Sequence, residues 1–164
     1  MIAPTLVFSW GNPSRGDDAL GPLFSERIEA MDLPGVECLT DFQLQVEHAL
    51  DLKGRERILF VDASLAAGAP FEFGDIKADR DVSFSSHALS PQAVLQAYRD
   101  VEGTEPPPAW LLGIRGERFE LGEPLSVAAR TNLDAALAWA HDWLSSPACA
   151  LPGSTAIPRP ATAG

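Results

Sequence analysis

Two aspartates and a histidine stand at three points of the chain where a ligand site could form. Asp18 follows one apolar segment, Asp62 follows another, and His87 lies in a polar stretch ahead of a predicted helix. Two carboxylates and an imidazole suit a borderline divalent metal and leave coordination positions open. Taken singly, Asp18 is explained as a helix cap, Asp62 by a loop hydrogen bond and His87 as a surface residue. Only their convergence predicts a metal site.

The segment before Asp18 predicts a buried strand that ends in a tight loop. Residues Ile2–Trp10 are almost wholly uncharged, as in a parallel strand covered on both faces. The turn formers between Gly11 and Gly16 then end this strand. A helix is predicted over residues 19–31, with Asp17 or Asp18 as its cap, and Asp17 is expected to tolerate asparagine better than Asp18. Ligands of open α/β sheets bind at such carboxyl-terminal loops.

The remaining elements predict an α/β domain with a mostly parallel sheet. Further strands are expected at 36–40, 57–61, 71–76 and 109–114, and helices at 42–52, after Ser90 and after Ser126. Their alternation implies right-handed crossovers. If the first and third strands are neighbours, Asp18 and Asp62 converge, and the His87 loop can reach the same edge. Residues 1–146 form the predicted domain, and the composition of residues 147–164 predicts a disordered tail.

Composition and motifs exclude several classes of function. The chain has 164 residues and a formal net charge of -11, which disfavours binding to nucleic acid or to an anionic membrane. Cys38 and Cys149 form no metal or disulfide pattern, and neither has a nearby histidine to activate it. Dinucleotide, phosphate-loop and nucleophile-elbow motifs are missing. The amino-terminal residues carry no secretory leader pattern, so we expect a cytoplasmic protein.

Taken in order, the motifs resemble those of the nickel–iron hydrogenase maturation endopeptidases. The first motif of that family, GN-x-x-x-x-D-[DE]-x-x-G after strand one, is matched by Gly11, Asn12, Asp17, Asp18 and Gly21. The second is a strand ending in Asp-Ala, matched at Asp62-Ala63, and the third is a histidine in a polar loop before a helix, matched at His87. A further similarity is the last strand, Leu111–Ile114. The resemblance extends from about residue 2 to residue 144.

The resemblance implies a fold, an activity and a metal. The fold would be a three-layer α/β/α sandwich around a five-stranded, mostly parallel twisted sheet with one antiparallel strand. The activity would be that of an aspartyl-type peptidase that removes the carboxyl-terminal extension of a nickel-loaded hydrogenase large-subunit precursor. Asp18, Asp62 and His87 match the metal-contacting positions of the family. The nickel would arrive within the precursor, and other divalent metals could substitute for it.

The chain also departs from the family pattern. Many relatives have Gly-Gly soon after strand two, where this chain has Asp41 to Gln45, and Ala19 replaces a common glycine. Gln43 and Gln45 look similar to the branch that serves cytoplasmic NAD-linked hydrogenases, and we expect both side chains to contact substrate at the rim of the site. Two other functions stay open: a non-catalytic assembly factor that senses nickel through the same ligands, and a small α/β hydrolase of unrelated substrate.

Overall fold

The computed structural model describes residues 2–80 and 89–147 of the chain. His87, one of the three predicted metal ligands, therefore lies outside the described residues. The predicted tail lies outside them too, apart from Pro147. The position of His87 and the disorder of the tail both stay predictions.

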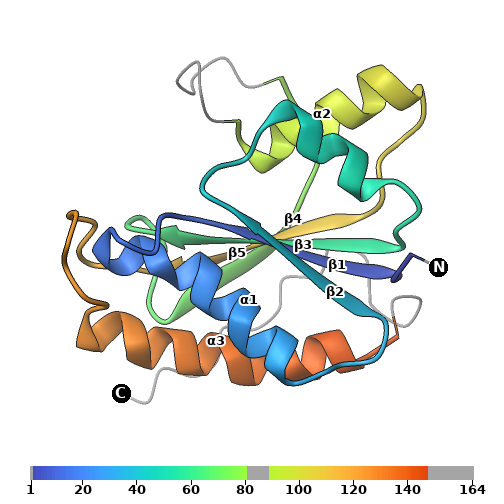
Figure 1. Cartoon of the computed structure of the whole chain (residues 1–164). Coiled ribbons are helices and arrows are strands. Elements are labelled where there is room, and N and C mark those ends of the chain that lie inside the picture. The colour runs from blue at the N-terminus through green and yellow to red at the C-terminus, as the bar shows by residue number, and fades with distance from the viewer. Residues whose placement is uncertain (1, 81–88, 148–164) are drawn as a thin grey trace.

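Within the described residues, five strands form one sheet in the order β2-β1-β3-β5-β4 (Figure 1). The strands are β1 (Thr5–Trp10), β2 (Val36–Asp41), β3 (Arg57–Ser64), β4 (Phe71–Ile76) and β5 (Ala109–Arg115). β1 pairs in parallel with β2 and β3, and β3 pairs in parallel with β5. Only β4, at one edge, runs antiparallel to its neighbour. The predicted sheet is confirmed, including its single antiparallel strand.

Helices cover both faces of this sheet and make three layers. The helices α1 (Leu20–Ala30) and α3 (Val127–Ser145) share a core with one face, through residues such as Phe24, Leu133 and Val61. The short 3-10 helix η2 (Val46–Leu52) and α2 (Pro91–Glu102) cover the opposite face, with Phe8 and Phe60 beneath them. Figure 1 shows α1 and α3 on one side of the strands and α2 on the other. No helix among residues 2–80 and 89–147 is long and apolar enough to cross a bilayer.

Local sequence explains where these helices begin. Ser90 and Ser126 accept hydrogen bonds from the backbone N–H groups three residues later, and so cap α2 and α3 as predicted. At α1 the prediction was wrong, because neither Asp17 nor Asp18 is its cap. A 3-10 turn, η1 (Gly16–Ala19), carries both acids, and α1 begins only at Leu20 without a side-chain cap.

Three other details differ from the prediction: the end of β3, the start of η2 and the exposure of one side chain of α2. β3 continues to Ser64, so Asp62 lies inside a paired strand rather than in the loop after it. The predicted helix over 42–52 is the shorter η2. The helical spacing of Val94, Tyr98 and Val101 predicts one inward face, but Val101 is 66% exposed at the end of α2. In each case the pairing or packing of the whole domain overrides the local pattern.

Arg57 attaches the end of α3 to the sheet. Its buried guanidinium donates to the carbonyl oxygens of Trp143 at 3.3 Å, Leu144 at 3.1 Å and Ser146 at 2.8 Å, and to Thr5 Oγ1 at 2.8 Å. The same group lies 4.5 Å from the centre of the Trp143 ring. The last carbonyls of a helix lack the regular helical hydrogen bond, and a cation interacts well with them, although the N–H of Ser146 also donates to the Trp143 carbonyl at 3.3 Å. The ordered body therefore extends to Ser146.

This attachment predicts where the chain can be shortened. A chain that ends at Pro147 should keep the melting temperature of the full chain, because the contacts of Arg57 remain. A chain that ends at Asp142 should lose at least about 3 kcal/mol of stability, since it removes the Trp143 side chain and the carbonyls that Arg57 binds. Thermal denaturation of both proteins checks this. An equally large loss in the longer chain would show that residues 148–164 pack on the body.

Candidate functional site

The two described acids of the predicted site lie where the topology of the sheet reverses. From β1 the chain moves to β2 on one side, whereas β3 adds on the other side of β1. Open α/β sheets bind ligands outside the carboxyl ends of strands at such a switch point. Asp18 lies in η1, after the loop that follows β1, and Asp62 lies near the carboxyl end of β3. The predicted neighbourhood of the first and third strands is confirmed.

The loop after β1 orients Asp18. The backbone N–H of Asn12 donates to Oδ2 of Asp18 at 2.7 Å, so one carboxylate oxygen is held against the start of the loop. The side-chain oxygen of Asn12 accepts from the N–H of Ser14 at 2.8 Å and closes the turn that makes this possible. Asn12 therefore shapes the loop with its side chain and fixes Asp18 with its backbone.

Two glycines of the first motif let this loop close tightly. A Cβ atom at Gly11 would overlap the carbonyl oxygen of Asp18, and Gly11 has a φ of +149° that other residues rarely adopt. A Cβ atom at Gly21 would overlap the carbonyl oxygen of Trp10, at the end of β1. Glycine is thus required at both positions because η1 and α1 lie directly on the end of the strand. The close approach of η1 and α1 to the end of β1 therefore explains the positions of Gly11 and Gly21 in the first motif.

Asp62 is a carboxyl group whose charged form is disfavoured. Burial, and in second place the negative charge of Asp18, raise its pKa to about 7, although the N–H of Ala63 partly opposes the shift. The effect of Asp18 shows that the two carboxylates are close enough to repel each other. Near neutral pH, Asp62 therefore exchanges its proton readily, which favours a role in acid–base chemistry or cation binding.

A metal site at Asp18 and Asp62 stays a prediction. A divalent cation would offset the repulsion that raises the pKa of Asp62, and carboxylate oxygens are suitable ligands. No group of three histidine, cysteine or acidic side chains that could hold a metal ion occurs among residues 2–80 and 89–147. A third ligand would have to come from elsewhere. His87 stays the predicted candidate, and it lies outside the described residues.

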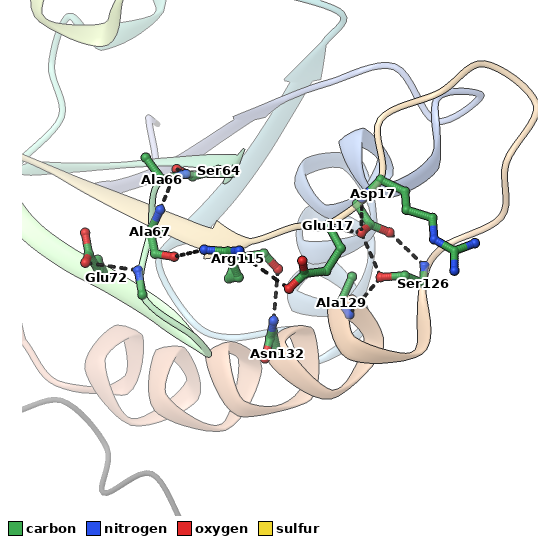
Figure 2. Close-up of polar contacts among 12 residues, drawn as sticks. Asp17, Ser64, Ala66, Ala67, Glu72, Arg115, Glu117, Ser126, Ala129 and Asn132 are labelled. Carbon is green, nitrogen blue, oxygen red and sulfur yellow. Dashed lines mark hydrogen bonds and ion pairs between the residues drawn. The ribbon is translucent and has the colours of Figure 1, made fainter.

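Asp17, the neighbour of Asp18, serves a different purpose. Its fully buried carboxylate accepts hydrogen bonds from the N–H groups of Glu117 at 2.7 Å and Arg118 at 3.0 Å, and from both the N–H and the hydroxyl of Ser126 at 2.7 Å each (Figure 2). Burial alone would raise its pKa, but these hydrogen bonds together hold the pKa below its ordinary value. The prediction that Asp17 is a loop acceptor is confirmed, and the loop it holds lies 100 residues away.

Gln43 and Gln45 follow β2, on the edge of the sheet where β1 and β3 also end. Gln45 occupies the cap position of η2, and its N–H donates to Nδ1 of His48 at 2.8 Å. The other ring nitrogen, Nε2, lies 3.0 Å from Oδ2 of Asp41, so the buried His48 holds this segment from both sides. His48 is therefore structural and buried. Contact of the two glutamines with substrate stays a prediction.

The turn after β3 is held by residues that the sequence did not single out. The Ser64 hydroxyl accepts from the N–H groups of Ala66 at 3.2 Å and Ala67 at 3.1 Å, and Arg115 donates to the carbonyl oxygen of Ala67 at 3.1 Å (Figure 2). Glu72 of β4 accepts from the N–H of Gly68 at 3.0 Å. The chain just beyond Asp62 is thereby fixed to β4 and β5.

Comparison with solved structures identifies the fold. HybD, the hydrogenase maturating endopeptidase from E. coli, is 25% identical, with 85% of this chain and 91% of that chain covered and a TM-score of 0.66. HycI, a [NiFe] hydrogenase maturation protease from Thermococcus kodakarensis KOD1, is 21% identical, with 88% and 94% covered and a TM-score of 0.66. The chain is thus similar over most of its length to solved [NiFe] hydrogenase maturation proteases. No protein-family model and no curated protein sequence matches it significantly.

The maturation-protease fold confirms the resemblance that the motifs indicated. A hydrogenase 3 maturation protease is also similar, at 17% identity, with 93% of this chain and 97% of that chain covered and a TM-score of 0.62. The similar structures include proteases of more than one hydrogenase and do not select a branch. The branch that Gln43 and Gln45 indicate therefore stays a prediction.

The hydrogen bonds of Asp17 reverse the expectation that this residue tolerates asparagine. In Asp17→Asn, an amide NH2 would face backbone donors, and each unsatisfied buried group costs about 1–3 kcal/mol. We expect a clear loss of stability at pH 7, measured by denaturant unfolding, and a smaller loss in Asp18→Asn. Because the folded-state pKa of Asp17 is lowered, its contribution is present above the unfolded-state pKa and disappears as pH falls through the folded-state value. The difference between wild type and Asp17→Asn should therefore shrink in acid.

The raised pKa of Asp62 predicts the opposite pH dependence. Between the unfolded value near ~4 and the folded value of about 7, the folded protein binds more protons, so stability falls as pH rises. Asp62→Asn removes this penalty and should be more stable than wild type at pH 8, by about 2–4 kcal/mol. The gain should vanish near pH ~4. Unfolding curves at both pH values check this, and equal stability at pH 8 would contradict the placement of Asp62.

Proposed function

We propose that this chain is the endopeptidase that removes the carboxyl-terminal extension of a nickel-loaded [NiFe]-hydrogenase large-subunit precursor. The observation that carries the proposal is the Asp18–Asp62 pair, in which burial and mutual repulsion raise the pKa of Asp62 to about 7. It lies at the switch point of a fold shared with a hydrogenase maturating endopeptidase. The partner is the precursor, and processing takes place in the cytoplasm.

In this proposal, Asp18 and Asp62 hold the precursor by its nickel, with His87 as the third ligand. Asn12 keeps one oxygen of Asp18 fixed, so the group is oriented before the precursor arrives. Nickel held there would polarise the scissile carbonyl or activate a water molecule, and other divalent metals could substitute for it. Asp62, charged once the cation is bound, would accept a proton from the water that attacks the carbonyl carbon and pass it to the amine that leaves when the C–N bond breaks. On this basis the enzyme is an aspartyl-type peptidase that depends on the metal of its substrate.

Gln43 and Gln45 contact the precursor rather than its metal in this proposal. They follow β2, whose end lies beside the end of β1, and amides can donate to and accept from a peptide backbone. His48 holds the backbone of Gln45 in place. The rival function, a nickel-sensing assembly factor without catalytic activity, would use the same ligands, so only the fate of the precursor separates the two.

The proposal predicts that each metal-contacting residue is needed for processing. Asp18→Asn, Asp62→Asn and His87→Ala should fold yet process nickel-loaded precursor at least about 100-fold more slowly than wild type. Mass spectrometry of the precursor measures the loss of a defined carboxyl-terminal peptide. Asp134→Asn, on the exposed face of α3, is the matched control and should process at the wild-type rate.

Three outcomes of this experiment are informative. Loss of one defined peptide with wild type, and not with the three variants, supports the endopeptidase. Stable binding of nickel-loaded precursor by wild type without a change of mass supports the assembly factor. Wild-type rates in all three site variants would contradict any function for the Asp18–Asp62 pair.

A further inference from the structure

A cleft of about 340 Å³ begins at Asp62 and extends across β5 to the edge strand β4. Its volume lies at the lower end of the range for ligand pockets. Leu111, Gly113 and Gly74 form the floor, and Ser64 and Ala67 of the fixed turn stand beside it. The cleft is therefore continuous with the candidate site.

The register of the strands explains why few side chains rise from the floor of this cleft. Asp62 is paired with Gly113, and Gly113 is paired with Glu72, so two acidic residues of one row are separated by a residue without a side chain. In the next row on this face, Phe60 is paired with Leu111, and Leu111 with Gly74. The two glycines thus open a path from Asp62 to the outer edge of β4.

Packing among residues 2–80 and 89–147 gives no reason for either glycine. Within that part of the chain, no atom lies within 4 Å of a Cβ placed at Gly74, and a Cβ at Gly113 would make only ordinary contacts with Ser64 and Ala67, at 3.6 and 3.8 Å. Neither residue has a positive φ. Glycine inside a strand weakens it, and it often marks a place where another backbone comes close. The observations favour a ligand whose main chain lies on this floor.

Resting on the proposed function, we propose that the precursor segment next to the cut lies extended over Gly113 and Gly74, and that Gly74 limits which segments fit. The cleft runs along β4 from Glu72 to Ile76, a length of roughly 13 Å, or about four residues of extended chain. One end of such a segment reaches Asp62.

The series Gly74→Ala, Gly74→Val and Gly74→Leu tests this assignment, because the described residues leave open space around a Cβ at Gly74. β-Branched residues favour strands, so stability should be unchanged or higher. The kcat/KM for nickel-loaded precursor should fall as the side chain at position 74 becomes larger. In the valine variant it should be about one tenth of the wild-type value or less, as expected if the bound precursor loses a few packing contacts with the cleft. The Kd for the precursor should rise in parallel, because substrate binding is obstructed.

Ala138→Leu, which adds the same kind of bulk on the exposed face of α3, is the matched control and should match wild type in both readouts. Unchanged kcat/KM and unchanged Kd across the Gly74 series, with normal melting temperatures, would overturn the proposal. If wild type cleaves no precursor at all, the proposed function fails. The Kd values of the Gly74 series still decide whether the cleft binds the precursor.

Discussion

The hydrogen bonds to the Asp17 carboxylate are the constraint on which the site depends. They join η1 to residues 117–126, and they also involve the serine that caps α3. The N–H of Asp17 donates to the carbonyl oxygen of Arg118 at 2.6 Å, so η1 is held through both main chain and side chain. With η1 fixed, its next residue, Asp18, is directed to the end of β1. The position of Asp18 therefore depends on the structural role of its neighbour.

Electrostatics gives Asp17 and Asp62 opposite properties. Both Asp17 and Asp62 lose water on folding, but Asp17 receives four hydrogen bonds and its pKa falls. Asp62 instead faces the charge of Asp18, and its pKa rises to about 7. A carboxyl group in that position destabilises the fold at neutral pH. A role in the candidate site therefore explains Asp62 better than a contribution to stability does. Binding a cation would recover the lost free energy, which couples occupancy of the site to stability.

Much of the fold was predictable because buried parallel strands and their turns leave a strong local pattern. The run before Trp10 and the caps Ser90 and Ser126 fixed their elements correctly. The roles of Asp17 and His48 were less accessible, since their partners depend on packing that brings distant segments together. The extension of β3 past Asp62 also follows from pairing with β5 rather than from the residues of β3. Pairing between distant segments produces no local periodicity in the sequence from which it could be predicted.

The antiparallel strand β4 explains why a cleft can exist beside Asp62. A parallel strand at this edge would need a crossover helix, which would pack on the sheet and cover the floor. β4 instead follows β3 through the short turn that Ser64, Glu72 and Arg115 hold in place. The cluster beneath α2 and η2 contains Phe8 and Phe60, and it also includes Ala109 of β5, with Leu111 and Ile76 packed against it. Within the described part of the chain, no atom lies within 4 Å of a Cβ placed at Gly74. The glycine floor is open there, and Asp62, the carboxyl group with the raised pKa, lies at one end of it.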